Sequence, residues 1–294
     1  MRGRGRFLRW PARDRASGIP LLVFSLNRAC QLDALLRSLD RHAPGLTPVT
    51  VLWKAADDAF RAGYDLCRSE HPDVAFVVED DFRADVVAWL QRKRLCALAV
   101  DDDVVYGPVG GEARRAFDDP EILAFSLRLG SNCTRCYALD REQPVPELRE
   151  TDGYVVWDWT TAELDFAYPG SLDLHVFRAE DLRAVVSGAS FSNPNGLEDV
   201  LARHLRSRAK RRRRPRRLLA SYKQSRVFGC PVNRVNSSHP NRFGTTIALP
   251  TAELNSRYLA GERVDLDVLD YADIRAVHHE LHLVLRPAKS GSLV

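Results

Sequence analysis

Residues 95–106 read LCALAVDDDVVY, an apolar run of six residues followed at once by three aspartates. A run of this kind is typical of a strand that is buried on both faces of a parallel sheet. Open α/β sheets bind their ligands at the carboxyl ends of the strands. We therefore expect residues 101–103 to lie at the ligand-binding edge of such a sheet.

Similar apolar runs occur upstream, and segments with helical spacing lie between them. The strand-like runs are IPLLVFS (19–25), VTVLW (49–53) and VAFVV (74–78). The helical segments are DALLRSL (33–39), AFRAGYDLC (59–67) and FRADVVAWLQRKR (82–94). The four runs start roughly 20 to 30 residues apart, which suits strand–helix–strand crossovers. The first hundred residues therefore predict an α/β fold with four parallel strands.

The pattern is less regular after residue 105. The runs expected to form strands are ILAFSLRLG (122–130), DGYVVWDWT (152–160, antiparallel), LDLHVF (172–177), LLASY (218–222) and HLVLR (282–286). The segments expected to form helices are LEDVLARHL (197–205) and TAELNSRYLAG (251–261). No repeat or linker divides the chain. We therefore expect an α/β fold whose Rossmann-type sheet continues into a mixed, partly antiparallel second half.

The composition is that of an ordinary globular protein, with 45% hydrophobic and 28% charged residues among 294. It excludes collagen-like, wholly disordered and disulfide-scaffold proteins. No run approaches the ~18 apolar residues of a membrane-spanning helix. The basic N-terminus is followed by only a short apolar stretch, unlike a secretory signal. We expect a cytoplasmic protein whose six cysteines are reduced. Cys133 and Cys136 are the only close pair, and a zinc or redox site is the alternative.

Positive charge is concentrated in two segments. Residues 206–217 (RSRAKRRRRPRR) carry nine basic groups and no acidic one, and residues 1–16 carry a net +5. Because the whole chain has a net charge of +4, the remaining residues carry −10. Runs of like charge are most often solvated. The alternatives are contact with an anionic membrane or a lipid-linked acceptor, and nucleic-acid binding, which the lack of interleaved aromatic residues disfavours.

The three aspartates offer ligands for a hard cation. Asp101 and Asp103, one residue apart, can hold Mg²⁺ or Mn²⁺ and bridge it to a diphosphate. Asp102 would then reach a ribose or sugar hydroxyl. A bound cation would also relieve the repulsion among adjacent carboxylates. The alternative interpretation is a solvated acidic turn.

Polar residues also follow the first and third strands. After the first strand, an arginine at the sheet edge can pair with a phosphate. The residues concerned there are Ser25, Asn27 and Arg28. After the third strand, Glu79 and Asp80 could accept hydrogen bonds from a base or a ribose. The alternative in both places is that these residues cap the helix that follows. After the third strand, Asp80 or Asp81 would be the capping residue.

The order of these features resembles that of GT-A-type glycosyltransferases, nucleotide-diphospho-sugar enzymes of the bacterial family-2-like kind. The first hundred residues carry this resemblance, with FSLNR (24–28) and VDDD (100–103) at strand ends. Further on, YPGS (168–171) is similar to the family's glycine-containing donor loop, and GLED (196–199) to its acidic catalytic motif. His239 stands where a late metal-binding histidine falls. The resemblance spans roughly residues 19–245.

The resemblance implies a GT-A-like fold and a metal-dependent enzyme of the hexosyltransferase type. Such an enzyme moves a sugar from a nucleotide-sugar donor to a glycan, lipid-linked or small-molecule acceptor. The metal, Mn²⁺ or Mg²⁺, would be held by Asp101, Asp103 and His239. The implied organisation is a basic extension (1–18) and one domain (19–294). Its nucleotide-binding half is 19–105, and its acceptor-side half, with the basic loop 206–217, is 106–294.

The resemblance also implies roles in catalysis. Gly170 and Ser171 would lie near the donor sugar, and Asp199 would be the general base of an inverting reaction, with Glu198 as second candidate. We expect both acids in the first turn of a helix, where the dipole favours the ionised form. The alternative is that they only stabilise that helix start. The metal would neutralise the departing nucleoside diphosphate. A retaining enzyme would not need this base.

Two further sets of residues have competing interpretations. His278, Glu280 and His282 would share one face of a strand and could replace His239 as metal ligands. Trp157 and Trp159 would share a strand face, where core packing competes with stacking on a sugar ring.

Other functions compete with glycosyl transfer. A nucleotidyltransferase uses a similar sheet but carries a glycine- and lysine-rich loop after the first strand, which SLNRACQ (25–31) is not. A metal-dependent phosphohydrolase carries its nucleophilic aspartate at that place. The non-enzymatic alternative is a binder of nucleic acid or anionic membrane that uses the arginine run.

Overall fold

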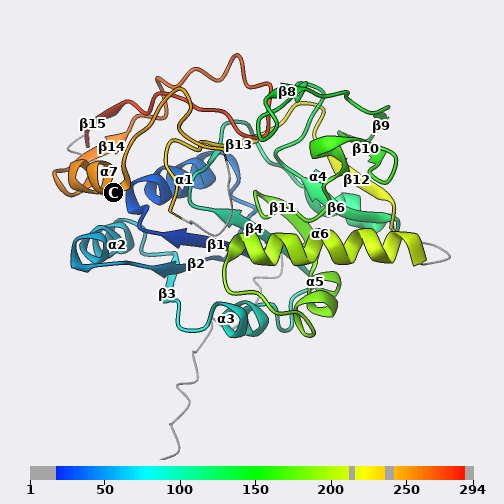
Figure 1. Ribbon diagram of the computed structural model, residues 1–294, viewed down its shortest axis with the longest axis horizontal. Coiled ribbons are helices and arrows are strands. Elements are labelled where there is room, and N and C mark those ends of the chain that lie inside the picture. The colour runs from blue at the N-terminus through cyan, green and yellow to red at the C-terminus, as the bar shows by residue number, and fades with distance from the viewer. Residues whose placement is uncertain (1–17, 212–215, 236–241, 289–294) are drawn as a thin grey trace, which may run out of the picture.

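The computed structural model describes residues 18–211, 216–235 and 242–288. Its centre is a nine-stranded sheet with the order β3-β2-β1-β4-β11-β6-β12-β10-β9 (Figure 1). The first four of these are β3 (Ala75–Val78), β2 (Val49–Lys54), β1 (Leu21–Leu26) and β4 (Leu95–Val100), and they pair in parallel. The prediction of four parallel strands is confirmed.

Helices connect these strands as the spacing predicted. They are α1 (Ala29–His42), α2 (Asp58–Glu70) and α3 (Phe82–Trp89). The third was expected to continue to residue 94 but ends five residues earlier. The reason is local, because Arg92 adopts φ 62° in the left-handed region, which a helix cannot include.

The second half of the chain continues the same sheet. The strands that this half adds to the sheet are β11 (His175–Arg178), β6 (Ile122–Ser126), β12 (Leu218–Ser221), β10 (Tyr154–Asp158) and β9 (Arg149–Thr151). β11 runs antiparallel to β4 and β6, β12 runs parallel to β6, and β10 runs antiparallel to its neighbours. The predicted fold class, α/β with a mixed second half, is confirmed. β11 starts three residues later than expected, because Leu174 has φ 50°.

Alternate residues of each central strand enter two different cores. Leu21 and Val23 of β1 pack with α1, α2 and α7 (Thr251–Leu259), whereas Leu22 and Phe24 pack with α3, α5 (Ala179–Val186) and α6 (Pro194–Arg211). The sheet therefore lies between two layers of helices (Figure 1). This burial on both faces explains why the strands read as continuous apolar runs.

Short elements complete the fold. The paired ones are β5 (Asp103–Val105) with β13 (Val227–Gly229), β14 (Glu262–Val264) with β15 (Leu285–Pro287), and β7 (Arg135–Cys136) with β8 (Arg141–Glu142). The others are α4 (Glu112–Arg115), η1 (Ala116–Asp118) and η2 (Leu164–Ala167).

Three observations bear on the remaining expectations. All six cysteines are buried and none forms a disulfide. Trp157 and Trp159 are buried, and their indole N–H groups donate to the carbonyls of Phe166 and Arg216, so the core interpretation is confirmed. Among the described residues, no helix combines the length and the apolar character that crossing a membrane requires.

Candidate functional site

Arg28 lies where β1 passes into α1 and is almost fully buried. One guanidinium nitrogen lies 3.0 Å from a carboxylate oxygen of Asp101 and 3.0 Å from one of Asp102. The others donate to the side chain and the carbonyl of Asn233, both at 2.6 Å. Burial alone would lower the pKa of Arg28, but Asp102 and Asp101 outweigh it and raise that pKa. The arginine predicted to meet a phosphate is thus already paired within the chain.

Asp101 is equally occupied. One carboxylate oxygen accepts from Arg28, and the other accepts from the Ser25 hydroxyl at 2.9 Å and the Leu26 N–H at 3.0 Å. Ser25 also hydrogen-bonds the Tyr64 hydroxyl at 2.6 Å. Asp101 therefore ties the ends of β1 and β4 together. Its role as a metal ligand stays a prediction.

Asp103 has a different environment. Its side chain is fully buried, one oxygen accepts from the Val100 N–H at 3.1 Å, and the other has no hydrogen-bond partner in the part of the chain that the structure describes. Burial, with Asp173 and Asp102 nearby, holds the pKa of Asp103 well above its usual range. A buried carboxylate oxygen without a donor is costly unless a proton or a cation meets it.

A second cluster forms around Asp173, which sequence reasoning missed. Its carboxylate accepts from Arg128 at 2.5 Å and lies 3.3 Å from the ring nitrogen Nε2 of His278. Its backbone N–H donates to the Ser171 hydroxyl at 3.2 Å. Burial opposes ionisation of Asp173, but Arg128 and His278 outweigh it and hold the pKa below its usual range. The available signal was the position of Asp173, just after the PGS turn.

The predicted donor loop contacts the predicted catalytic helix. A Cβ on Gly170 would lie 2.7 Å from the Ala202 backbone nitrogen, so only glycine lets this loop approach α6 so closely. The Leu172 N–H donates to Glu198 at 3.2 Å. The structure thus brings Gly170 and Ser171 together with Glu198, while their roles stay predictions.

The two acids of α6 differ in their surroundings. Burial, and then Asp173, raise the pKa of Glu198 to about 7. Asp199 is exposed. The helix begins at Pro194, where Asn193 accepts from the Gly196 N–H at 2.9 Å, so both acids lie beyond its first turn. The expected stabilisation by the helix dipole is therefore wrong, since that effect fades within one turn.

His278 connects the two clusters. Its neighbours on the chain bond to both sides of Gly229, and a Cβ on Gly229 would lie 2.6 Å from the His278 ring. Burial would lower the pKa of His278, but Asp173 and Asp102 raise it above its ordinary value. His278 is thus close to carboxylates that follow β4 and to one that precedes β11.

The other tail residues do not join His278. Of the expected strand 282–286, only residues 285 and 286 lie in a strand, β15, so residues 278, 280 and 282 do not share a strand face. Glu280 accepts from the backbone N–H groups of residues 245–247 and from the Tyr137 hydroxyl. Burial opposes ionisation, yet these donors lower the pKa of Glu280 to about 2. His239, the first choice as a late metal ligand, lies outside the described residues.

The predicted site residues Asn27, after β1, and Glu79 and Asp80, after β3, form local contacts. Asn27 has φ 58° and accepts from the Ala56 N–H at 2.8 Å, which fixes a turn. Glu79 lies 3.3 Å from Lys54, and the Asp80 N–H donates to Asp85. Asp81 caps α3. The capping alternative is thus correct for Asp81, whereas contact of Asn27, Glu79 or Asp80 with a nucleotide stays a prediction.

The fit of a divalent cation depends on the donors that remain. Within residues 18–211, 216–235 and 242–288, no three His, Cys, Asp or Glu side chains cluster as metal ligands. The oxygen of Asp103 without a partner, the Asp102 carboxylate and the His278 imidazole are nevertheless donor types that suit Mn²⁺ or Mg²⁺. Asp103 therefore fits a cation that takes most of its other oxygens from a bound phosphate.

A curated protein, the bifunctional glycosyltransferase pgtA of Dictyostelium discoideum, is 22% identical to the chain over 257 residues. The predicted resemblance to glycosyltransferases is confirmed. The match covers 77% of the chain but 33% of pgtA, so the chain spans about a third of this relative's length. No family model matches the chain.

Solved structures are less similar. The mannosyltransferase PcManGT from Pyrobaculum calidifontis, solved with GDP-Man and Mn²⁺, has 14% identity and a TM-score of 0.36, covering 61% of the chain and 49% of its own. The WbbM bifunctional glycosyltransferase has 15% identity and a TM-score of 0.32, with coverages of 64% and 38%. A third structure, 4-diphosphocytidyl-2C-methyl-D-erythritol synthase, has 15% identity and a TM-score of 0.35, and the match covers 62% of the chain and 85% of the synthase. TM-scores this low carry no argument about function.

Proposed function

We propose that the chain is a metal-dependent glycosyltransferase of the hexosyltransferase type, which uses a nucleotide-sugar donor. The observation that carries the proposal is the meeting of two acidic groups, Asp102 and Asp103 after β4 and Asp173 before β11, around Arg128 and His278. Ligands bind α/β sheets at this edge. The sequence similarity to pgtA supports glycosyl transfer as the reaction class. Because β11 joins β4 in one sheet, we also propose that residues 19–294 form one domain.

The donor would lie against the carboxyl ends of β1 to β4, with its sugar at the loop that contains Gly170 and Ser171. Asp102 and Asp103, together with Asp101 and with His239 or His278, would hold a divalent cation, which when bound would neutralise the diphosphate. Arg28 and Asp101 would fix the strand ends that the nucleotide meets.

For the transfer itself we propose inversion, with Asp199 as the base that takes the proton of the acceptor hydroxyl. Asp199 is the acid of the pair that faces solvent, from which an acceptor arrives. Glu198 would act through the loop, because its carboxylate accepts from the Leu172 N–H and so positions the segment that carries Asp173. Glu198 is therefore a positioning residue in this proposal.

A thermal-shift screen with UDP-, GDP-, CMP- and dTDP-sugars, with and without Mn²⁺, tests the donor site. A ligand that binds only the native state raises the apparent stability by mass action. We expect one nucleotide to give a shift that requires the metal and is lost in Asp102→Asn. Asp102 is a better choice than Asp101, whose removal would also free the end of β1. A protein that no nucleotide sugar stabilises would contradict the proposal.

A further inference from the structure

The long helix α6 has one buried face and one charged face. The buried positions, spaced by four residues, are Leu197, Leu201 and Leu205. The exposed positions include four at helical spacings of four, three and four residues, and these are Asp199, Arg203, Arg206 and Lys210. Residues at such spacings lie along one face of a helix. The candidate base therefore stands at the head of a row of three cations, which we call the basic stripe (Arg203, Arg206, Lys210).

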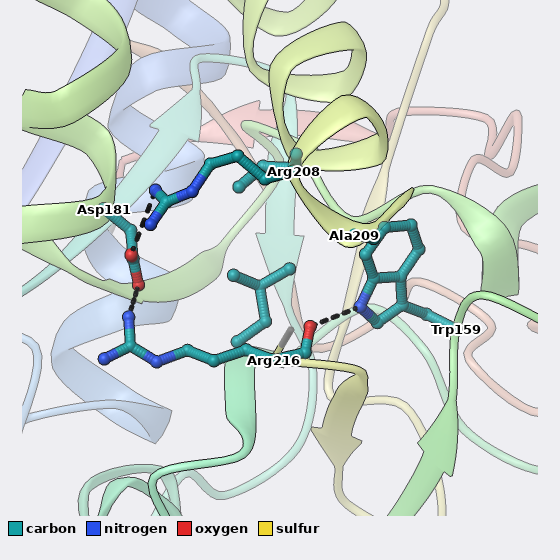
Figure 2. A pocket seen from close by; sticks show the side chains of 7 residues that line it. Trp159, Asp181, Arg208, Ala209 and Arg216 are labelled. Atoms are coloured by element: carbon teal, nitrogen blue, oxygen red, sulfur yellow. Dashed lines mark hydrogen bonds and ion pairs between the residues drawn. The ribbon is translucent and has the colours of Figure 1, made fainter. Parts of the chain in front are cut away.

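Other cations of the arginine run serve the fold instead. Arg208 and Arg216 reach Asp181 from two sides, and the Arg216 carbonyl accepts from the Trp159 indole (Figure 2). Asp181 is buried and lies on α5, so these ion pairs attach the end of α6 and the segment before β12 to the rest of the protein. The run is thus not uniformly solvated: part of it is internal, and the basic stripe is external.

The stripe is continuous with the candidate site. The Arg206 guanidinium lies 5.4 Å from the centre of the Tyr168 ring and donates to the Ala167 carbonyl at 3.4 Å. Tyr168 belongs to the predicted donor loop, and burial together with Glu198 raises its pKa. Arg203 donates to the Asp199 carbonyl at 3.2 Å. The cations therefore begin where the sugar is proposed to be transferred.

The spacing of the stripe indicates the kind of partner. A helix rises about 1.5 Å per residue, so neighbouring cations are about 4.5 to 6 Å apart along the axis and the row from Asp199 to Lys210 is about 16 Å long. A line of cations attracts a chain with repeated negative charges and raises its local concentration. An anionic membrane would instead contact a broad basic surface, and nothing in such a contact would require the row of cations to begin at Asp199.

From this arrangement we infer that the acceptor is an anionic glycan, which lies along α6 with its carboxylates on the basic stripe and its attacking hydroxyl at Asp199. The inference rests on the proposed function and specifies its acceptor. It also gives the stripe a role in the reaction, because the charges would place the acceptor chain in register with the base.

Binding of a labelled hexagalacturonate to the full chain, measured by fluorescence anisotropy, tests this inference, with maltohexaose as the neutral probe. We expect hexagalacturonate to bind, the affinity to fall with added salt, and maltohexaose not to bind. The triple variant Arg203→Gln, Arg206→Gln, Lys210→Gln should weaken binding about tenfold or more, since three exposed ion pairs contribute together.

A matched variant removes the same charge elsewhere. This second triple variant is Arg41→Gln, Arg61→Gln, Arg68→Gln. Its three residues lie on α1 and α2, and α2 is at the other end of the molecule from the C-terminal end of α6 (Figure 1). This variant should bind hexagalacturonate within about twofold of the unchanged protein, because charges beyond a Debye length are largely screened. The melting temperatures of both variants show whether each is folded.

Three outcomes would overturn the inference. The first is an equal loss of hexagalacturonate affinity in the two triple variants. The second is binding to vesicles of phosphatidylcholine and phosphatidylserine but not to hexagalacturonate. The third is that neither hexagalacturonate nor maltohexaose binds. The thermal-shift screen with nucleotide sugars distinguishes failure of this inference from failure of the proposed function. If a nucleotide sugar and Mn²⁺ raise the melting temperature but hexagalacturonate does not bind, only the proposed anionic acceptor is wrong. If hexagalacturonate binds but no nucleotide sugar raises the melting temperature, the proposed transferase activity is wrong.

Discussion

The Asp101–Arg28 pair and the acids that face the 168–173 loop, which are Asp103, Asp173 and Glu198, differ in how they are satisfied. Asp101 has three donors, two from the end of β1 and one from Arg28, and Arg28 also donates to Asn233. Asp103 has one oxygen without a partner among the described residues, and burial and Asp173 raise the pKa of Glu198 to about 7. The Asp101–Arg28 pair ties the ends of β1 and β4 together. The acids that face the loop include unsatisfied groups, as expected where a ligand binds.

The largest effect expected on activity comes from Asp199→Asn. A positioned general base contributes about 10²- to 10⁴-fold, so kcat should fall by that factor while the melting temperature changes little. Single-turnover kinetics with the donor identified by the thermal-shift screen would measure it. Asp65→Asn, which changes another exposed helical acid, one that pairs with Arg68, is the control and should keep the kcat of the unchanged protein. An unchanged kcat in Asp199→Asn would remove the base from the mechanism.

Arg28→Ala should give the largest loss of stability. It leaves Asp101 and Asp102 without their shared cation, and breaking a buried pair in this way costs about 3–5 kcal/mol. Urea unfolding measures the loss. Arg61→Ala, which removes an exposed and loose pair with Asp58, should cost at most about 1 kcal/mol. If the two variants were equally stable, the joint at the end of β1 would not be structural.

Gly229→Ala tests how closely His278 is seated. The added methyl group would overlap the imidazole, and overpacking of this kind typically costs about 1–3 kcal/mol. Because His278 must shift, metal-dependent donor binding should weaken as well. Gly45→Ala is the control, since a Cβ there meets nothing within 4 Å. Melting temperatures of Gly229→Ala and Gly45→Ala, measured with and without donor and Mn²⁺, test this prediction. If the two variants had the same melting temperatures, the His278 ring would move aside at no cost.

The smallest expected effect is on the pH dependence of stability. The pKa of Glu198 is raised from its ordinary value of 4.5 to about 7, so between these values the folded state binds more protons than the unfolded state. The contribution of Glu198 is therefore present below about pH 4.5 and is lost as the pH rises through 7. After allowance for solvent screening, we expect about 1–2 kcal/mol.

Glu198→Gln isolates this contribution from those of Asp101 and Asp103, whose pKa values are also raised. The variant should gain stability relative to the unchanged protein as the pH rises from 5 to 8. Urea titrations at several pH values would show the difference. A constant difference across that range would mean that Glu198 is ionised throughout and faces solvent.

Much of the fold was predictable because burial leaves a direct trace in the sequence. The strands β1 to β4 are buried on both faces, so each reads as an apolar run, and Asp101 to Asp103 had to follow the last of them. The GLED and YPGS segments were also predicted to belong to one site, and the structure brings them together through Glu198 and Leu172. The function of these groups stays a proposal.

The partners of each charged group were not predictable, because they come from residues far away in the chain. Arg28 meets Asn233, 205 residues later, and Asp173 meets His278 and Arg128. The sequence therefore determined which strands form, at which edge the acids lie and which helix faces are apolar, since these follow from local spacing. Only the tertiary structure decided that Asp101 has three donors and that one oxygen of Asp103 has none among the described residues. These properties depend on which distant donors the packed elements bring within hydrogen-bond distance.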